Sequence, residues 1–314
     1  MNTHDVVKHR TLPILFLLIL LCLTGSAQAG SNGFFVTYNS EVEKGELELM
    51  LMNDITAPSH FRREEGFGTY LSHMIELEYG ITHQLATEFM IEWFEDLESG
   101  EAAFTGFRWE NRFRLFKRDV PLNPMIYVEY EDLDPKTRYK MEVSGWVDPP
   151  YEEEEEEPDR ERIIETRLVL SQDFGPVNVA FNWINETDLA SGRTAFGYAL
   201  GAMWMIHGKH PKNQHHKMAH HDMATHEEKP TESSDKNKKE EEEHKKGIGL
   251  GLEMYGALGD TKSFGLKPKR QEHYLGPIFM YHFNKHWMTH AQLAIGLSKA
   301  SDNLVRVNMG YKFF

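Results

Sequence analysis

Histidine is concentrated in one polar stretch of the chain, residues 207–247, which also contains Met218 and Met223. A five-residue unit occurs there twice in succession, first as His215-His216-Lys217-Met218-Ala219 and then as His220-His221-Asp222-Met223-Ala224. Neutral imidazole binds copper, zinc and nickel, and the thioether of methionine favours Cu(I). The pattern therefore predicts metal ligands within this stretch, namely His207, His210, His215, His216, Met218, His220, His221, Met223, His226 and His244.

The remaining residues of 207–247 are mostly lysine, glutamate, serine and proline, a composition that cannot bury a core. Two interpretations stay open. One is a segment that binds copper, zinc or nickel, and the other is a solvated polar loop whose histidines bind nothing. The spacing implies no fixed four-ligand geometry, so a structural zinc site is not predicted.

A second set of polar residues alternates with apolar ones over most of the chain. Side chains at every second position share one face of a β-strand, so these charges are predicted to point into a common interior. Opposite charges there can pair across strands as a stabilising filling, whereas an excess of acid makes a path that prefers cations. The predicted lumen-lining residues are Glu76, Glu78, Glu88, Glu92, Arg108, Glu110, Arg112, Arg114, Glu129, Glu165, Arg167 and Glu253.

The elements that position these residues are strands of about ten residues. Tilted membrane strands need ~9–11 residues, while strands of soluble sheets usually have ~5–6. Twelve segments alternate in this way, and short turns between them alternate with longer connections, as in transmembrane barrels. The segments lie near residues 47–51, 71–79, 89–93, 107–115, 126–130, 164–170, 177–183, 196–206, 250–254, 275–283, 287–297 and 305–313.

We therefore predict an all-β fold, a transmembrane antiparallel β-barrel of about 12 strands. Aromatic residues near the predicted strand ends are typical of the two bilayer interfaces. A mean hydropathy of -0.54 is too polar for a helical membrane protein, and a formal charge of -15 argues against nucleic acid as a partner. The predicted partner is membrane lipid, with metal ions at the histidine-rich stretch.

The first 29 residues have the pattern of a secretory signal peptide. Lys8 and Arg10 precede an apolar run from Ile14 to Leu23, and Ala27-Gln28-Ala29 fits the cleavage site. The sole cysteine, Cys22, lies within this segment. The expected organisation is a signal peptide at 1–29 and a barrel domain at 30–314, with a disordered insertion at 207–247.

The last ten residues, Val305 to Phe314, resemble the C-terminal assembly signal of bacterial outer-membrane proteins. The usual glycine stands five residues before the terminal aromatic, but Gly310 stands four before Phe314, so the aromatic alternation runs from Phe313. Glu78 to Thr82 and His273 to Pro277 also resemble parts of small porin-like or transporter-like outer-membrane barrels. The resemblance implies the bacterial outer membrane, with the barrel-insertion machinery as a partner of the last strand.

Three functions are compatible with the sequence. The first is a channel or transporter-like barrel with an acidic lumen and metal capture by the histidine-rich stretch. The second is an outer-membrane enzyme of the lipase or protease type, although the chain has neither a Gly-x-Ser-x-Gly elbow nor a His-Glu-x-x-His helix. The third is a closed structural or metal-buffering barrel. No catalytic residue and no certain cofactor is predicted.

Overall fold

A computed structural model describes residues 33–64, 66–116, 120–134, 143–147, 160–207 and 247–313. The predicted signal peptide and Phe314 lie outside the described residues, as do the predicted metal ligands from His210 to His244. His207 is described only as the last backbone position of a strand. Within the described ranges, no helix is long and apolar enough to cross a membrane.

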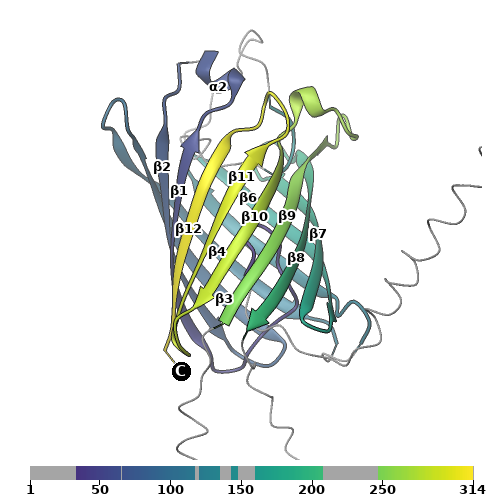
Figure 1. Cartoon of the computed structure of the whole chain (residues 1–314). Helices are drawn as coiled ribbons and strands as arrows, with labels where there is room; N and C mark the ends of the chain where they lie inside the picture. Colours follow the sequence, from purple (N-terminus) through teal and green to yellow (C-terminus); the bar gives the residue numbers. More distant parts are fainter. Residues whose placement is uncertain are drawn as a thin grey trace, which may run out of the picture.

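Twelve strands form one closed antiparallel barrel, in which each strand pairs with its sequence neighbours (Figure 1). The prediction of an antiparallel barrel of about 12 strands is confirmed. In the described parts of the connections lie two short helical turns, α2 (His60–Glu64) and η2 (Pro268–Arg270). The strands are β1 (Leu47–Ala57), β2 (Tyr70–Gly80), β3 (Leu85–Asp96), β4 (Ala102–Arg114), β5 (Met125–Leu133), β6 (Glu161–Phe174), β7 (Val177–Asp188), β8 (Thr194–His207), β9 (Gly247–Asp260), β10 (His273–His282), β11 (Trp287–Gly296) and β12 (Asn303–Lys312).

The ring closes where β1 pairs with β12. Their register runs from Glu48 opposite Lys312 to Ala57 opposite Asn303. Closure pairs the backbone N–H and C=O groups of the first and last strands, which would otherwise form an open edge. A lipid environment requires this, because hydrocarbon offers no hydrogen-bond partner to an exposed backbone.

The outward faces of the strands are apolar, whereas the inward faces carry most of the charged side chains together with some buried apolar ones. In β12 the side chains of Val305, Val307 and Met309 are exposed, while Arg306 and Asn308 are buried. The same alternation in the other strands produces an apolar outer surface. Its exposed residues include Leu51, Ile55, Leu77, Phe89, Trp109, Phe113, Val128, Leu168, Leu200, Leu252, Phe279, Leu293 and Ile295.

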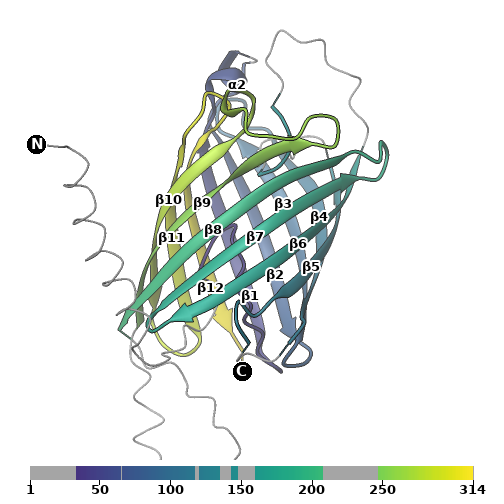
Figure 2. The ribbon, with the colours of Figure 1, turned by 90° about the vertical axis from the view of Figure 1, so that its right-hand side faces the viewer.

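The barrel has two different ends (Figures 1 and 2). We call the end where β1 begins and β12 ends the terminal end, and the opposite one, which carries α2, the loop end. The connections at the terminal end include two short turns, 175–176 and 283–286. Because β8 finishes and β9 starts there, the histidine-rich stretch leaves the barrel at the terminal end, as its predicted position after the eighth strand requires.

Aromatic rings gather at both ends of the strands. At the terminal end the ring of Tyr311 lies 4.8 Å from that of Trp287 and 4.9 Å from that of Phe313, measured between centroids. At the loop end the Trp183 ring lies 6.2 Å from Phe196 and 6.1 Å from Phe264. Such amphipathic rings favour the boundary between hydrocarbon and headgroups.

The apolar outer surface leads to a test of membrane burial. Val307→Arg places a charge in the middle of β12 on the outer face, and we expect it to lower the free energy of unfolding in lipid vesicles by about 2–4 kcal/mol. Leu189→Arg, at an exposed position in the β7–β8 turn, is the control and should cost about 0–1 kcal/mol. Equal costs for the two variants would contradict a lipid-facing belt.

Candidate functional site

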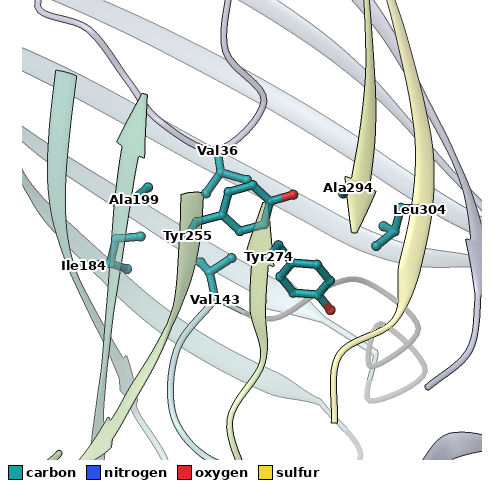
Figure 3. Packing of buried hydrophobic residues seen from close by; sticks show 8 residues of the cluster. All are labelled: Val36, Val143, Ile184, Ala199, Tyr255, Tyr274, Ala294 and Leu304. Carbon is teal, nitrogen blue, oxygen red and sulfur yellow. The ribbon is translucent and has the colours of Figure 1, made fainter. Parts of the chain in front are cut away.

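The chain before the first strand lies inside the barrel. Residues 33–46, which we call the lumen segment, enter the interior from the terminal end, turn near Val36 and return to β1 (Figures 2 and 3). Val36 belongs to a buried cluster that joins wall residues of six strands to Val143 of the β5–β6 connection. The wall residues in this cluster are Ile184, Ala199, Tyr255, Tyr274, Ala294 and Leu304.

One buried carboxylate holds the turn of the lumen segment. The backbone N–H groups of Phe35, Val36 and Thr37 donate to Glu253 on β9 over 3.0, 3.0 and 2.8 Å. Gln292 Nε2 donates to the same carboxylate at 2.6 Å. Consecutive N–H groups that converge in this way form a concave anion-binding site. Glu253 therefore satisfies three backbone donors that would be costly to leave unpaired in the interior.

Further polar contacts fix the returning half of the segment. The backbone of Tyr38 exchanges two hydrogen bonds with the side-chain amide of Asn182. The Tyr38 N–H donates to Oδ1 at 2.7 Å, and Nδ2 donates to the Tyr38 carbonyl at 2.9 Å. Arg167 Nη1 donates to the carbonyl of Val36 at 2.7 Å, and the Tyr38 hydroxyl donates to Glu110 at 2.8 Å. Burial, reinforced by Glu110, raises the pKa of Tyr38 well above its usual value, so the phenol keeps the proton that it donates.

The wall is shaped to receive the aromatic residues of the segment. A Cβ atom at Gly201 of β8 would lie 2.5 Å from the Phe34 ring, so only glycine leaves room for that ring. The Phe35 ring stacks on His290 with centroids 4.8 Å apart, and the Arg306 guanidinium lies 5.1 Å from the centre of the same ring. The segment thus fits the lumen by shape as well as by hydrogen bonding.

Seven glutamates from seven adjacent strands form a continuous row on the lumen wall. Each is the direct cross-strand partner of the next, from β1 through β7. We call this row the glutamate ladder; it consists of Glu48, Glu78, Glu88, Glu110, Glu129, Glu165 and Glu186.

The glutamate ladder runs from one end of the barrel to the other. Glu48 is the second residue of β1, at the terminal end, and Glu186 lies near the finish of β7, at the loop end. Barrel strands tilt, so a row perpendicular to them changes depth as it passes round the wall (Figure 1). Carboxylates are therefore presented at successive depths along the lumen, about 5 Å from one strand to the next.

Three arginines sit beside the glutamate ladder, and two of them are shared among several acceptors. Arg112 contacts Glu78 at 2.6 Å, Glu110 at 2.7 Å and Glu88 at 3.5 Å. Arg108 contacts Glu131 at 2.9 Å, Glu129 at 3.1 Å and Glu92 at 3.5 Å. Arg167 pairs with Glu165 on its own strand.

This sharing leaves an excess of acid. Two carboxylates 5 Å apart repel on the order of 3 kcal/mol at an effective dielectric constant of about 20. Like charges that stand directly opposite in a sheet are destabilising, and one guanidinium cannot neutralise three carboxylates. The glutamate ladder is consequently a wall that attracts cations or protons.

The lumen segment separates two small cavities. The cavity at the terminal end has a volume of about 60 Å³ and is lined by seven glutamates against Arg112 and Lys312. The cavity toward the loop end has about 140 Å³ and is lined by six glutamates against Arg108, Arg167 and Arg306. Phe35 and Tyr38 of the segment line both cavities, as do Met52 and Glu76 of the wall, so the segment lies between the two cavities.

The loop end is narrowed by other contacts. Arg62 from α2 binds Asp302 at 2.8 Å and the Tyr70 hydroxyl at 2.9 Å. Asp302 is fully enclosed, and this burial raises the pKa of its carboxyl although Arg62 opposes the effect. Residues 143–147 also turn inward, with single β-bridges from Ser144 and Gly145 to β8 and β9.

The structure places the side chains of all twelve predicted lumen residues on the inward face. Glu76, Glu88, Glu92, Glu110, Arg112, Arg114, Glu129, Glu165, Arg167 and Glu253 are buried there, and Glu78 and Arg108 are partly buried. Sequence reasoning did not find Glu186, the register that joins the ladder, or the lumen segment. The short apolar run from Phe34 to Val36, which precedes the first strand, was the one local signal of that segment.

A closed antiparallel ring, an apolar outer surface and a charged interior together define a transmembrane β-barrel of the outer-membrane type. No family model matches the chain, and no curated protein matches it. It is similar to an outer membrane channel from Pseudomonas putida F1, at 10% identity and a TM-score of 0.46, over 87% of this chain and 98% of that chain.

Two other solved barrels are similar to the chain. The KdgM porin, solved in complex with disordered oligogalacturonate, is 9% identical with a TM-score of 0.43, over 85% of this chain and 99% of that chain. The translocator domain of the autotransporter NalP from Neisseria meningitidis is 9% identical with a TM-score of 0.40, over 99% of this chain and 96% of that chain. All three likenesses extend to the fold alone.

Removal of the Glu253 carboxylate should release the lumen segment. In a Cys22→Ser background, Ser40→Cys introduces a single thiol at a buried position of the segment. We expect Glu253→Ala to speed the labelling of this thiol by a water-soluble maleimide by about tenfold or more, since each lost charge-assisted hydrogen bond contributes about 1.5–3 kcal/mol.

The matched control for this release is Glu92→Ala, which removes a buried lumen carboxylate that contacts Arg108 instead of the segment. Gel mobility of unboiled samples verifies that each variant is folded. Identical labelling rates in both variants would show that Glu253 does not hold the segment.

Proposed function

We propose that the protein is an outer-membrane channel that passes cations along the glutamate ladder. The observation that carries this proposal is the unbroken row of seven cross-strand glutamates between the two ends of the barrel. A purely structural filling would pair each acid with its own base, whereas here three arginines serve most of the row. Rings and rows of carboxylates favour cations over anions in pores.

We further propose that the lumen segment closes this path. It divides the interior at Phe35 and Tyr38, and its polar contacts come from strands on opposite parts of the wall. The conformation described here is then a closed state. Release of the segment joins the two acidic cavities into one passage. The last strand, β12, is proposed to be the part that the barrel-insertion machinery recognises.

Planar-bilayer recording tests the channel. A variant without residues 33–43 should conduct more than the full chain and should prefer K⁺ to Cl⁻. In this open background, Glu110→Gln with Glu129→Gln should lower the K⁺/Cl⁻ permeability ratio by about fivefold or more, the factor that about 1 kcal/mol of lost attraction produces. Both residues lie at the middle of the glutamate ladder.

Glu98→Gln with Glu101→Gln removes the same charge from an exposed turn between β3 and β4 and should leave selectivity nearly unchanged. A folded open variant that carries no current would reject the channel in favour of a closed structural barrel. An unchanged ratio in the ladder variant would remove the ladder from the path.

We also propose that the histidine-rich stretch captures metal ions at the terminal end. The support is the tandem His-His-x-Met-Ala unit in the sequence, together with the exit of this stretch where β8 finishes and β9 begins. Imidazole and thioether side chains in a polar segment suit copper above all, with zinc and nickel as alternatives. The channel does not depend on this role.

Calorimetry tests metal capture. We expect Cu(II) or Zn(II) binding that weakens below about pH 6, because imidazoles must lose their protons to bind metal. Replacement of residues 208–246 by a short Gly-Ser linker keeps both strands whole and should abolish the binding without unfolding the barrel. Binding that survives the replacement would place the ligands elsewhere.

A further inference from the structure

Glu76 on β2 is a buried carboxylate that has no partner among the residues that the structure describes. Its residue surface is 6% exposed, and within the part of the chain that the structure describes it takes no hydrogen bond and no ion pair. It faces both lumen cavities. Buried charges are normally paired, hydrogen-bonded or bound to a metal ion, so this side chain lacks a counterpart.

Two more carboxylates converge on the same place. Glu76, Glu78 and Glu88 each offer an oxygen, and these oxygens lie within 4.8 Å of one another. Oxygens that bind one Ca²⁺ at about 2.4 Å cannot be more than about 4.8 Å apart, so the spacing matches a shared cation. Glu88 Oε1 is also fully buried and accepts no hydrogen bond in the described residues.

The protein supplies too little positive charge for this trio. Arg112 contacts Glu78 and Glu88 but also Glu110, so one guanidinium faces three carboxylates and none of its contacts reaches Glu76. Lys312, the other cation at this cavity, contacts Glu46 and Glu48. The comparable trio of Glu129, Glu131 and Glu165 differs, because an arginine contacts each of its three members: Arg108 contacts Glu129 and Glu131, and Arg167 contacts Glu165.

We infer that Glu76, Glu78 and Glu88 form a binding site for a hard divalent cation of the Ca²⁺ class. Carboxylate oxygens select calcium, magnesium or manganese over softer metals. The adjoining cavity of about 60 Å³ exceeds the space that one water molecule needs, so the ion can keep part of its hydration. Calcium accepts the irregular geometry of such a site more readily than magnesium does.

This inference deepens the proposed cation path and rests on it in part, because it names the place near the terminal end where a passing ion halts. The site lies beside the partition made by the lumen segment, since Phe35 and Tyr38 line the same cavity. A cation held there would neutralise the acidic wall while the passage is closed. Ion binding and ion passage can be measured separately, so each idea can fail alone.

Calcium binding to the refolded full-length chain tests the site. Chelator-treated protein is titrated with Ca²⁺ by calorimetry, and its urea midpoint is measured with and without Ca²⁺. We expect Glu76→Gln and Glu88→Gln each to lower the affinity of the tightest Ca²⁺ site by about tenfold or more. Without Ca²⁺ both variants should resist urea at least as well as the unaltered protein, because a repulsive charge is gone.

Glu92→Gln is the matched control, because it removes a buried β3 carboxylate that contacts Arg108. This variant should keep the affinity of the tightest Ca²⁺ site unchanged. A flat titration of the unaltered protein would mean that protons alone balance the trio and would overturn the site. Tight binding that both trio variants retain would also overturn it. A cation-selective current together with a flat titration would support the cation path and reject the Ca²⁺ site. Tight Ca²⁺ binding without any current would support the site and reject the path.

Discussion

The pairing of β1 with β12 is the constraint on which the other features depend. A bilayer cannot satisfy an exposed strand edge, so twelve strands of this length are stable in it only as a ring. Once the ring is shut, each strand has one face toward lipid and one toward an enclosed space. Leucine, valine and phenylalanine occupy the first face, and the charges collect in the second. The ring also fixes which residues stand side by side, and this register joins one glutamate from each of seven strands.

Because the lumen is enclosed, the charges inside it must be balanced mainly by other groups of the protein. Arg108 and Arg112 lie between several acids, and each stabilises more than one of them. The lumen segment contributes in a different way, because its backbone amides bind Glu253 and its carbonyl at Val36 accepts from Arg167. The segment thus supplies neutral donors and acceptors where the wall lacks partners. The closure proposed for the segment and its stabilisation of the wall have the same physical origin.

The strands, their number and the side of each residue could be predicted from the sequence because these features are local. Alternation within Val305 to Phe313, for example, is visible without any partner strand. The register could not be predicted in this way. Glu48 and Glu78 meet only when two strands align, and a shift of one residue would turn one of them outward. The lumen segment escaped prediction because its anchor, Glu253, lies more than two hundred positions away and its own residues have no strand periodicity. The metal ligands predicted at residues 207–247 fall almost wholly outside the described residues and stay a prediction.

The lumen segment also limits the order in which the parts of the barrel can assemble. It is continuous with β1, one of the two strands of the seam, while its anchors stand on β4, β6, β7, β9 and β11. If the seam joined first, polar backbone would have to be threaded into a cylinder already crowded with side chains. If the segment instead docks on the sheet while the sheet is still open, this obstacle does not arise. The pairing of β1 with β12 then forms last, around the docked segment. On this view the barrel assembles and its lumen is closed in a single step, so each barrel is in the closed state as soon as it is assembled.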